Sequence, residues 1–182
     1  QYVVVATGYF DNPNMLGVPG EELPKVSHYY KDAHPYQGMK VVVVGGKNSA
    51  VEAAMELERT GAEVTMVYRG DKLTEHVKAW VRPVIESLLA KGRIRMLYRT
   101  RLTEITERTV TVETEHGAET IDNDYVFALT GFHPDHQFLS GMGVRMDERT
   151  GAPDFDAETM ETNMDGLYVA GVLAAGFDAN VI

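Results

Sequence analysis

The sequence predicts an α/β fold with a central parallel sheet and a small β-meander. Residues 41–44 form an unbroken apolar run, which is typical of a parallel strand buried on both faces. A segment with helical spacing of apolar residues follows, and a second apolar strand over residues 62–68 completes a βαβ unit. Between residues 102 and 121, three short alternating segments indicate antiparallel strands.

The chain begins in a β-branched run, QYVVVA over Gln1–Ala6, which predicts a strand ending at Thr7-Gly8. A connection rich in proline and glycine follows over residues 11–24. Near the other end, residues 167–176 (LYVAGVLAAG) indicate a strand that enters a Gly/Ala turn. Since both ends fall at such strands, we expect that the chain is part of a longer protein.

The first helix is predicted to begin at Ser49. Its apolar residues have the spacing of one buried helix face: Ala50, Ala53, Ala54 and Leu57. Gly61 is expected to end the helix, because the position after a helix favours a left-handed residue. A second helical region is predicted with Thr74 as its cap and Pro83 as a kink. Its apolar positions are Val77, Trp80, Val81, Ile85, Leu88 and Leu89.

The remaining strands are short. They are predicted over residues 95–97, 102–105, 110–113, 119–121 and 125–129. His116-Gly117 is expected to form a turn within the meander, and the last of these strands ends at Thr130-Gly131.

Composition excludes several classes of function. Hydrophobic residues make up 44% and charged residues 24% of the chain, as in ordinary globular proteins. The formal net charge of −10 disfavours binding to nucleic acid or to an anionic membrane. No apolar run is long enough to cross a bilayer and no leader is recognisable, so we expect a cytoplasmic protein. The chain has no cysteine, which excludes disulfides and thiol chemistry by its own side chains.

The stretch VVVVGGKNSA over residues 41–50 predicts a strand, a turn and a helix start that bind a pyrophosphate. Gly45, Lys47 and Ala50 occupy the three marked positions of the G-x-G-x-x-G/A pattern. Gly45 supplies the tight turn, Ala50 permits close packing, and Gly46 keeps one neighbour without a side chain. Lys47 replaces the middle glycine and adds a positive charge. The predicted site covers Gly45, Gly46, Lys47, Asn48, Ser49 and Ala50.

Arg69 indicates which dinucleotide this turn binds. It stands 24 residues after Gly45, at the end of the second strand, where an acidic residue would bind the ribose hydroxyls of NAD. Arginine favours the 2′-phosphate of NADP instead. Tyr68 is expected either to lie against the adenine or to pack within the protein. The alternatives are a strand–turn–helix without a ligand and a solvated charge at Arg69.

Four sequence segments together support a resemblance to a known protein family. They are VVVATGYF at 3–10, VVVVGGKNSA at 41–50, LTGFHPD at 129–135 and GLYVAGVLAAG at 166–176. Their order and spacing resemble the flavoprotein reductases of the low-molecular-weight thioredoxin reductase type, in which an NADP domain is inserted into a split FAD domain. With HYYKDAHPY at 28–36, the combination resembles the bacillithiol-disulfide reductases within that group.

The resemblance implies a division of the chain and a set of NADPH contacts. Residues 1–22 and 136–182 are expected to be partial FAD-domain segments, the first with a linker, and residues 23–135 the NADP-binding domain. The NADPH contacts implied are the turn residues with Glu52, Tyr68, Arg69, Lys72, Thr130 and Gly131. Glu52 matches a carboxylate near the nicotinamide. Arg69 matches the first of two arginines that hold the 2′-phosphate, and Gly70 replaces the second. The contact with the phosphate is therefore expected either to be weaker or to be shared with Lys47 or Lys72.

Flavin contacts are also implied by the resemblance. Thr7, Gly8 and Gly171 match backbone contacts to the flavin side, whereas Val172 stands where an aspartate is usual. The FAD domain is expected to be incomplete in this chain. We therefore expect the isolated chain to bind NADPH and to retain little or no FAD.

The implied activity is electron transfer from NADPH through FAD to a low-molecular-weight disulfide, and bacillithiol disulfide is the acceptor that the resemblance favours. No side chain of this chain is expected to act in catalysis. HYYK at 28–31 stands where thioredoxin reductases have their redox dithiol, so reduction of thioredoxin by that route is excluded. The alternatives are a ferredoxin or other NADP-dependent flavoprotein reductase or monooxygenase, and a catalytically silent NADP-binding module. The sequence leaves open whether the protein forms a homo-oligomer.

Two polar groups of residues are assigned no site. His133, Asp135 and His136 are not expected to bind a metal, because Pro134 disfavours a regular helix and no further ligand lies nearby. Glu56 and Glu58 are expected to lie on a solvated helix face.

Overall fold

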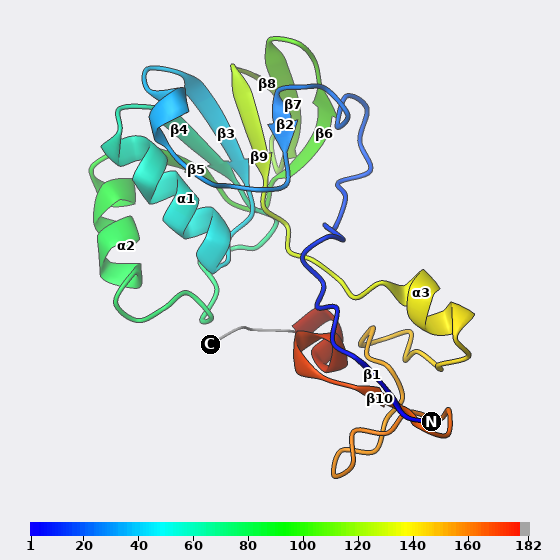
Figure 1. Ribbon diagram of the computed structural model, residues 1–182. Coiled ribbons are helices and arrows are strands. Elements are labelled where there is room, and N and C mark those ends of the chain that lie inside the picture. The colour runs from blue at the N-terminus through cyan, green and yellow to red at the C-terminus, as the bar shows by residue number, and fades with distance from the viewer. Residues whose placement is uncertain (179–182) are drawn as a thin grey trace. The chain divides into compact units, whose positions relative to one another are not determined.

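In the computed structural model, which describes residues 1–178, strand β3 (Lys40–Val44) lies at the centre of a five-stranded parallel sheet. The strand order is β2 (Val26–Ser27), β9 (Tyr125–Ala128), β3, β4 (Glu63–Val67) and β5 (Ile94–Leu97). The predicted α/β fold with a central parallel sheet is confirmed (Figure 1). Strand β2 was not predicted, since two residues give no recognisable periodicity.

The described chain divides into two compact units. The central unit is Met15–Thr130, and the flanking unit comprises Gln1–Asn14 and the chain from Gly131 onward. The divisions expected from the sequence, at residues 22/23 and 135/136, lie eight and five residues further along the chain. The assignment of the parts to NADPH and FAD stays a prediction. Residues 179–182, the end of the predicted third segment, lie outside the described residues.

The consecutive valines of β3 face two separate cores of the central unit. Val41 and Val43 belong to the core beneath the helices, whereas Val42 and Val44 belong to the core beneath the meander. All four side chains are at most 8% exposed. The strand is therefore buried on both faces, as its apolar run predicts.

Helix α1 (Asn48–Arg59) covers one face of the sheet with its alanine-rich side. All four residues predicted to form its buried face are at most 1% exposed: Ala50, Ala53, Ala54 and Leu57. Gly61 has φ 94°, so the left-handed position after the helix is also confirmed.

Helix α2 (Arg82–Ala90) begins later than predicted. Thr74 does not cap it, and Pro83 lies in its first turn rather than at a kink. The physical reason is that the first turn has no intrahelical partner for its N–H groups, so proline fits there. Val77, Val81 and Ile85 are buried as predicted, but Trp80 precedes the helix and is 74% exposed.

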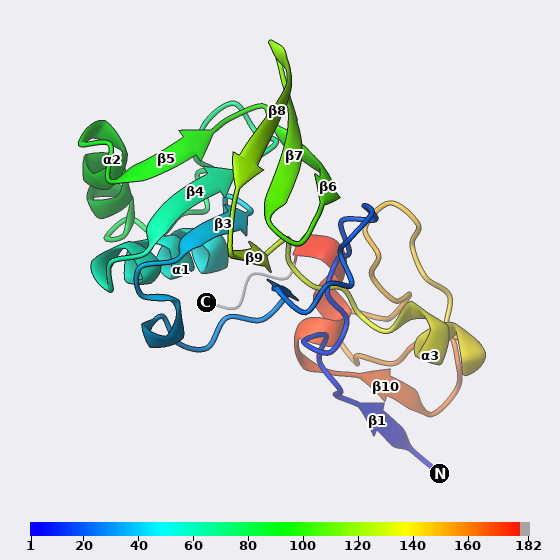
Figure 2. The same ribbon diagram turned by 90° about the horizontal axis from the view of Figure 1, so that it is seen from above.

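The predicted meander is confirmed as an antiparallel three-stranded sheet (Figure 2). It consists of β6 (Arg101–Ile105), β7 (Thr109–Thr114) and β8 (Gly117–Asp122). Its alternating apolar residues pack with β3, β4 and β9: Leu102, Ile105, Val110, Val112 and Ile121. The central sheet thus lies between α1 and α2 on one face and the meander on the other.

The flanking unit contains a parallel pair, β1 (Val3–Val5) and β10 (Leu167–Val169). Its core is formed by Val5, Leu139, Val144, Val169 and Leu173. It also contains α3 (His136–Gly141) and a 3₁₀ segment, η2 (Gly171–Asp178).

Residues 133–135 are not helical, as Pro134 predicts, and α3 begins only at His136. The side chain of Asp135 caps α3 by accepting a hydrogen bond from the N–H of Phe138 at 2.9 Å. Among the described residues, no group of three or more His, Cys, Asp or Glu side chains could hold a metal. Within the same part of the chain, no helix is long and apolar enough to cross a membrane.

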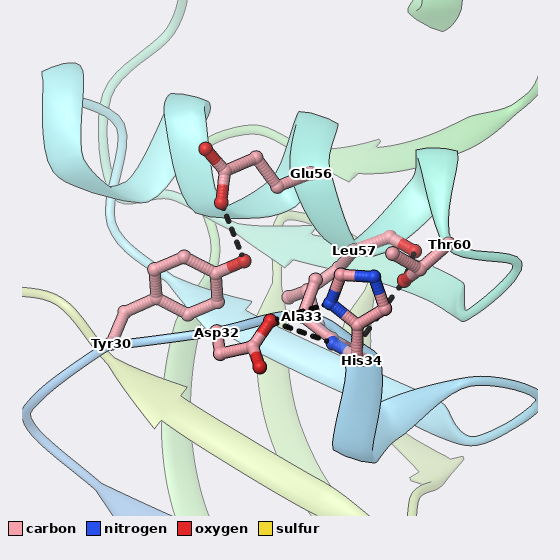
Figure 3. A network of polar contacts seen from close by, with 7 residues as sticks. All are labelled: Tyr30, Asp32, Ala33, His34, Glu56, Leu57 and Thr60. Carbon is pink, nitrogen blue, oxygen red and sulfur yellow. Dashed lines mark hydrogen bonds and ion pairs between the residues drawn. The ribbon is translucent and has the colours of Figure 1, made fainter.

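The outer side of α1 carries a polar network with the segment that precedes η1 (His34–Tyr36) (Figure 3). The Tyr30 hydroxyl donates to Glu56 at 2.9 Å, and burial, together with this bond, raises the pKa of Tyr30. Asp32 lies 2.7 Å from the His34 ring, and hydrogen bonds with His34 lower the pKa of Asp32.

The prediction of a solvated carboxylate face on α1 was wrong for Glu58. Its side chain is 8% exposed and forms an ion pair with Arg93. Arg93 lies between α2 and β5, so the pair joins the C-terminal part of α1 to the chain that enters the edge strand.

Candidate functional site: the turn between β3 and α1

The turn after β3 has a conformation and a spacing that require glycine at its first position. Gly45 has φ 142°, and its N–H donates to the carbonyl of Val67 at 3.0 Å. A methyl group on Gly45 would lie 2.5 Å from the carbonyl oxygen of Leu129 and 2.8 Å from the Cβ of Ala50. The glycine therefore lets the turn pass close to β9 and lets α1 start directly against β3.

Lys47 replaces a glycine without backbone strain. Its φ of −98° and ψ of −175° are extended values that any residue adopts. The side chain is exposed and does not cap the helix. The first helical bond runs from the N–H of Val51 to the carbonyl of Lys47 at 3.1 Å. The N–H groups of residues 48–50 precede this bond, so they carry the positive end of the helix dipole and suit an anion.

The second glycine of the turn makes room for an aromatic ring. A methyl group on Gly46 would lie 2.5 Å from Cγ and Cδ2 of Tyr68, and one on Gly70 would lie 2.8 Å from its Cζ. Neither glycine has a left-handed φ, so what requires glycine here is the space taken by the ring. Of the two roles expected for Tyr68, the structure shows packing against these two backbone segments.

Cations predicted to bind the 2′-phosphate lie beside this turn. Val44 and Val67 are paired in the parallel ladder, so the turn after β3 and the segment after β4 leave the same edge of the sheet. Arg69 and Lys72 lie on the second segment and are exposed. Neither forms an ion pair within the described residues, and their charges are therefore available to an anion.

Asn48 and Glu52 contact a segment that the sequence did not single out. The side-chain amide of Asn48 donates to the carbonyl of His76 and accepts from the N–H of Lys78, both at 2.9 Å. The Lys78 ammonium lies 2.8 Å from the Glu52 carboxylate. These contacts hold residues 76–78 on the first turn of α1. No sequence signal indicated these contacts, because they join residues that are 26 or more positions apart.

Thr130 follows β9 on the other side of β3, where Val44 pairs with Ala128. It therefore leaves the same edge of the sheet as the glycine turn. Gly131 belongs to the flanking unit, has φ 93°, and its carbonyl accepts from the N–H of Asn14 at 2.9 Å.

The three residues predicted to contact flavin lie together in the flanking unit. Val5 pairs with Val169, so Thr7 and Gly8 leave the same edge as Gly171. A methyl group on Gly8 would lie 3.9 Å from a methyl of Val172. Gly8 has φ 69° and Gly171 has φ 73°, and both therefore expose backbone in left-handed turns.

A separate cavity of about 420 Å³ lies at the opposite edge of the central sheet. Lys40 and Glu63, which begin β3 and β4, line it together with Arg95 and Asp122. Lys40 lies 3.6 Å from Asp122, and Arg95 pairs with Glu119 at 2.6 Å. Because its basic side chains are paired in this way, the cavity has little positive charge to offer a phosphate. Ligands of open parallel sheets bind at the carboxyl ends of the strands, which favours the glycine turn.

Comparison with known proteins identifies the family to which this chain is similar. The sequence profile of a family described as pyridine nucleotide-disulphide oxidoreductase matches residues 1–171. The chain is 53% identical over its full 182 residues to bacilliredoxin reductase Bdr of Bacillus subtilis (strain 168). It spans 56% of that relative's length.

Two solved structures have the same fold. Bacillithiol disulfide reductase Bdr (YpdA) from Bacillus cereus superposes with a TM-score of 0.96 at 52% identity, over 97% of this chain and 55% of that one. The enzyme of that name from Staphylococcus aureus superposes with a TM-score of 0.94 at 48% identity, over 98% and 56% of the two chains. The resemblance drawn from the sequence is thereby confirmed.

Proposed function

Because this chain belongs to the pyridine nucleotide-disulphide oxidoreductase family, we propose that it is the NADPH-binding portion of a flavin-dependent disulfide reductase. The observation that carries the proposal is the edge of the central sheet. There the glycine turn and the uncapped start of α1 lie next to the exposed cations that follow β4. One part suits a pyrophosphate and the other suits the 2′-phosphate.

The chain's own residues bind and orient the nucleotide in this proposal. The N–H groups of Asn48, Ser49 and Ala50 donate to the pyrophosphate, and Lys47 adds a charge beside it. Arg69 and Lys72 bind the 2′-phosphate. In the complete protein, bound NADPH would supply a hydride to FAD, which would in turn reduce a disulfide.

Glu52, Thr130 and Gly131 are proposed to lie on the nicotinamide side. Glu52 fits this role because its ion pair with Lys78 holds the carboxylate on the first turn of α1. Thr130 fits it because it leaves the sheet beside the glycine turn.

FAD is proposed to bind the complete protein with backbone contacts from Thr7, Gly8 and Gly171. Left-handed turns at both glycines support this, since they let a ligand approach the backbone. Val172 offers no carboxylate at the expected position. We therefore keep the proposal that the 182-residue chain alone retains little FAD.

The proposed acceptor is a low-molecular-weight disulfide, with bacillithiol disulfide favoured by the names of the two solved structures. This chain has no cysteine, so thiol chemistry would not use its side chains. A cytoplasmic location is part of the proposal, because a reductase of small disulfides suits a compartment whose thiols are kept reduced. The net charge of −10 supports a protein that binds neither nucleic acid nor an anionic membrane.

Titration calorimetry of the 182-residue chain with NADPH tests the nucleotide site. We expect saturable binding of one NADPH per chain, because the central unit contains the turn, the helix start and both cations. The chain with Lys47→Ala and Lys72→Ala is expected to bind more weakly. A folded chain that gives no heat at millimolar NADPH would contradict the proposal.

Turnover by the complete protein tests the acceptor. With FAD bound, we expect oxidation of NADPH to depend on added bacillithiol disulfide, followed by the loss of absorbance from NADPH. Ferredoxin serves as the comparison acceptor. Turnover with ferredoxin and none with the disulfide would instead support a ferredoxin reductase.

A further inference from the structure

The Tyr68 side chain connects the two halves of the nucleotide site. Its near end lies against Gly46, since a methyl group there would be 2.5 Å from Cγ. Its far end lies against Gly70, where a methyl group would be 3.0 Å from the phenolic oxygen. The ring thus extends from the turn after β3 to the backbone next to Arg69.

The backbone of Tyr68 is fixed by hydrogen bonds to residues at and after the end of the edge strand β5, and its ring is half-buried. Its N–H donates to the carbonyl of Leu97 at 2.9 Å, and its carbonyl accepts from the N–H of Thr100 at 3.1 Å. Within residues 1–178, the phenolic hydroxyl has no hydrogen-bond partner. Half-buried phenols ordinarily find a partner, so this hydroxyl is available to a ligand.

The order of the groups along the Tyr68 ring corresponds to the adenosine part of NADPH. In that part, the ribose lies between the pyrophosphate and the 2′-phosphate. The protein places a pyrophosphate turn at one end of the Tyr68 ring and Arg69 at the other. We propose that Tyr68 is a specificity-determining residue whose ring lines the adenosine ribose and whose hydroxyl donates a hydrogen bond to the 2′-phosphate. The inference rests on the proposed NADPH site.

Gly70 supports this role. Any side chain at position 70 would begin 2.4 Å from Cε1 of the Tyr68 ring and 3.0 Å from its phenolic oxygen. Gly70 itself has an ordinary φ, so its backbone would accept an alanine. The Tyr68 ring in this position therefore requires glycine at position 70.

The test compares Tyr68→Phe with the unchanged chain by calorimetry with NADPH and with NADH. Phenylalanine keeps the ring, so the fold is expected to be unchanged in circular dichroism. We expect NADPH to bind roughly tenfold more weakly, because a hydrogen bond to a charged group is lost. NADH, which has no 2′-phosphate, is expected to bind as before.

Tyr36→Phe is the matched control. Tyr36 packs against Tyr125, which begins β9 at the opposite edge of the sheet, so losing its hydroxyl should change neither affinity. Unchanged NADPH affinity in Tyr68→Phe would overturn the inference, and so would equal losses for both nucleotides. If the unchanged chain binds neither nucleotide, the proposed function fails as well.

Gly70→Ala gives an independent measurement. Its methyl group is expected to displace the hydroxyl and to reduce the preference for NADPH about as much as Tyr68→Phe does. Since both changes act on one hydroxyl, combining them should reduce the preference no further. A second, additive loss of the preference would overturn the inference. Gly141→Ala serves as control, because a methyl group there would meet nothing within 4 Å.

Discussion

Replacing Arg69 by alanine is expected to weaken NADPH binding by tenfold or more, while NADH binding changes little. A charge-assisted bond to a phosphate contributes about 1.4–3 kcal/mol, which corresponds to roughly tenfold to 150-fold in affinity. Arg69 is exposed on the segment after β4, next to the glycine turn. Calorimetric titration of the variant with each nucleotide gives the two affinities.

Arg59→Ala is the control for this change. Arg59 is an exposed arginine at the far end of α1, so its removal lowers the net charge equally without touching the site. Its NADPH affinity should stay within a small factor of the original. If Arg69→Ala weakens NADPH and NADH equally, Arg69 does not distinguish the 2′-phosphate.

Replacing Gly45 by alanine is expected to abolish detectable NADPH binding and to lower the free energy of unfolding by about 3 kcal/mol. The new methyl group would lie 2.5 Å from the carbonyl oxygen of Leu129, and φ would remain at an unfavourable 142°. Overpacking and a left-handed conformation each cost about 1–3 kcal/mol. Urea unfolding followed by circular dichroism measures the stability, and calorimetry measures the binding.

Gly141→Ala separates this effect from the general cost of adding a methyl group to a glycine. A methyl group at Gly141 meets no neighbour within 4 Å, so stability and NADPH affinity should both be kept. A Gly45→Ala chain as stable as the original, with its NADPH affinity intact, would show that the turn tolerates a side chain.

The sequence correctly predicted those helices and strands whose pattern of apolar residues is compatible with only one type of secondary structure. Ala50 and Leu57 recur at helical spacing, and only a helix places such residues on one face. Helix α2 was harder, because Pro83 is compatible either with a kink or with a first turn. Its start depends on where the chain packs, and Trp80 shows that an apolar residue near a helix need not join the core.

The candidate site likewise contains features that the sequence could predict and features that it could not. The turn at Gly45 could be predicted, because its residues are adjacent in the sequence and follow a known chemical pattern. The contacts of Asn48 with residues 76–78 and the burial of Glu58 against Arg93 could not. Each depends on distant segments meeting in space. The packing of Tyr68 on Gly46 and Gly70 is of the same kind.

The unbroken valines of β3 have a consequence for how the strand finds its partners. Sliding the strand by one residue would exchange side chains between its two faces, and such slippage is usually resisted by the change of chemistry. In β3 such a shift would replace one valine by another at each interior position, so the interior side chains contribute little to fixing the register. Its alignment must be fixed at the ends, where the N–H of Lys40 donates to Asp124 at 2.8 Å and that of Gly45 donates to Val67 at 3.0 Å. The turn at Gly45 therefore also helps to fix the alignment of β3 with β4.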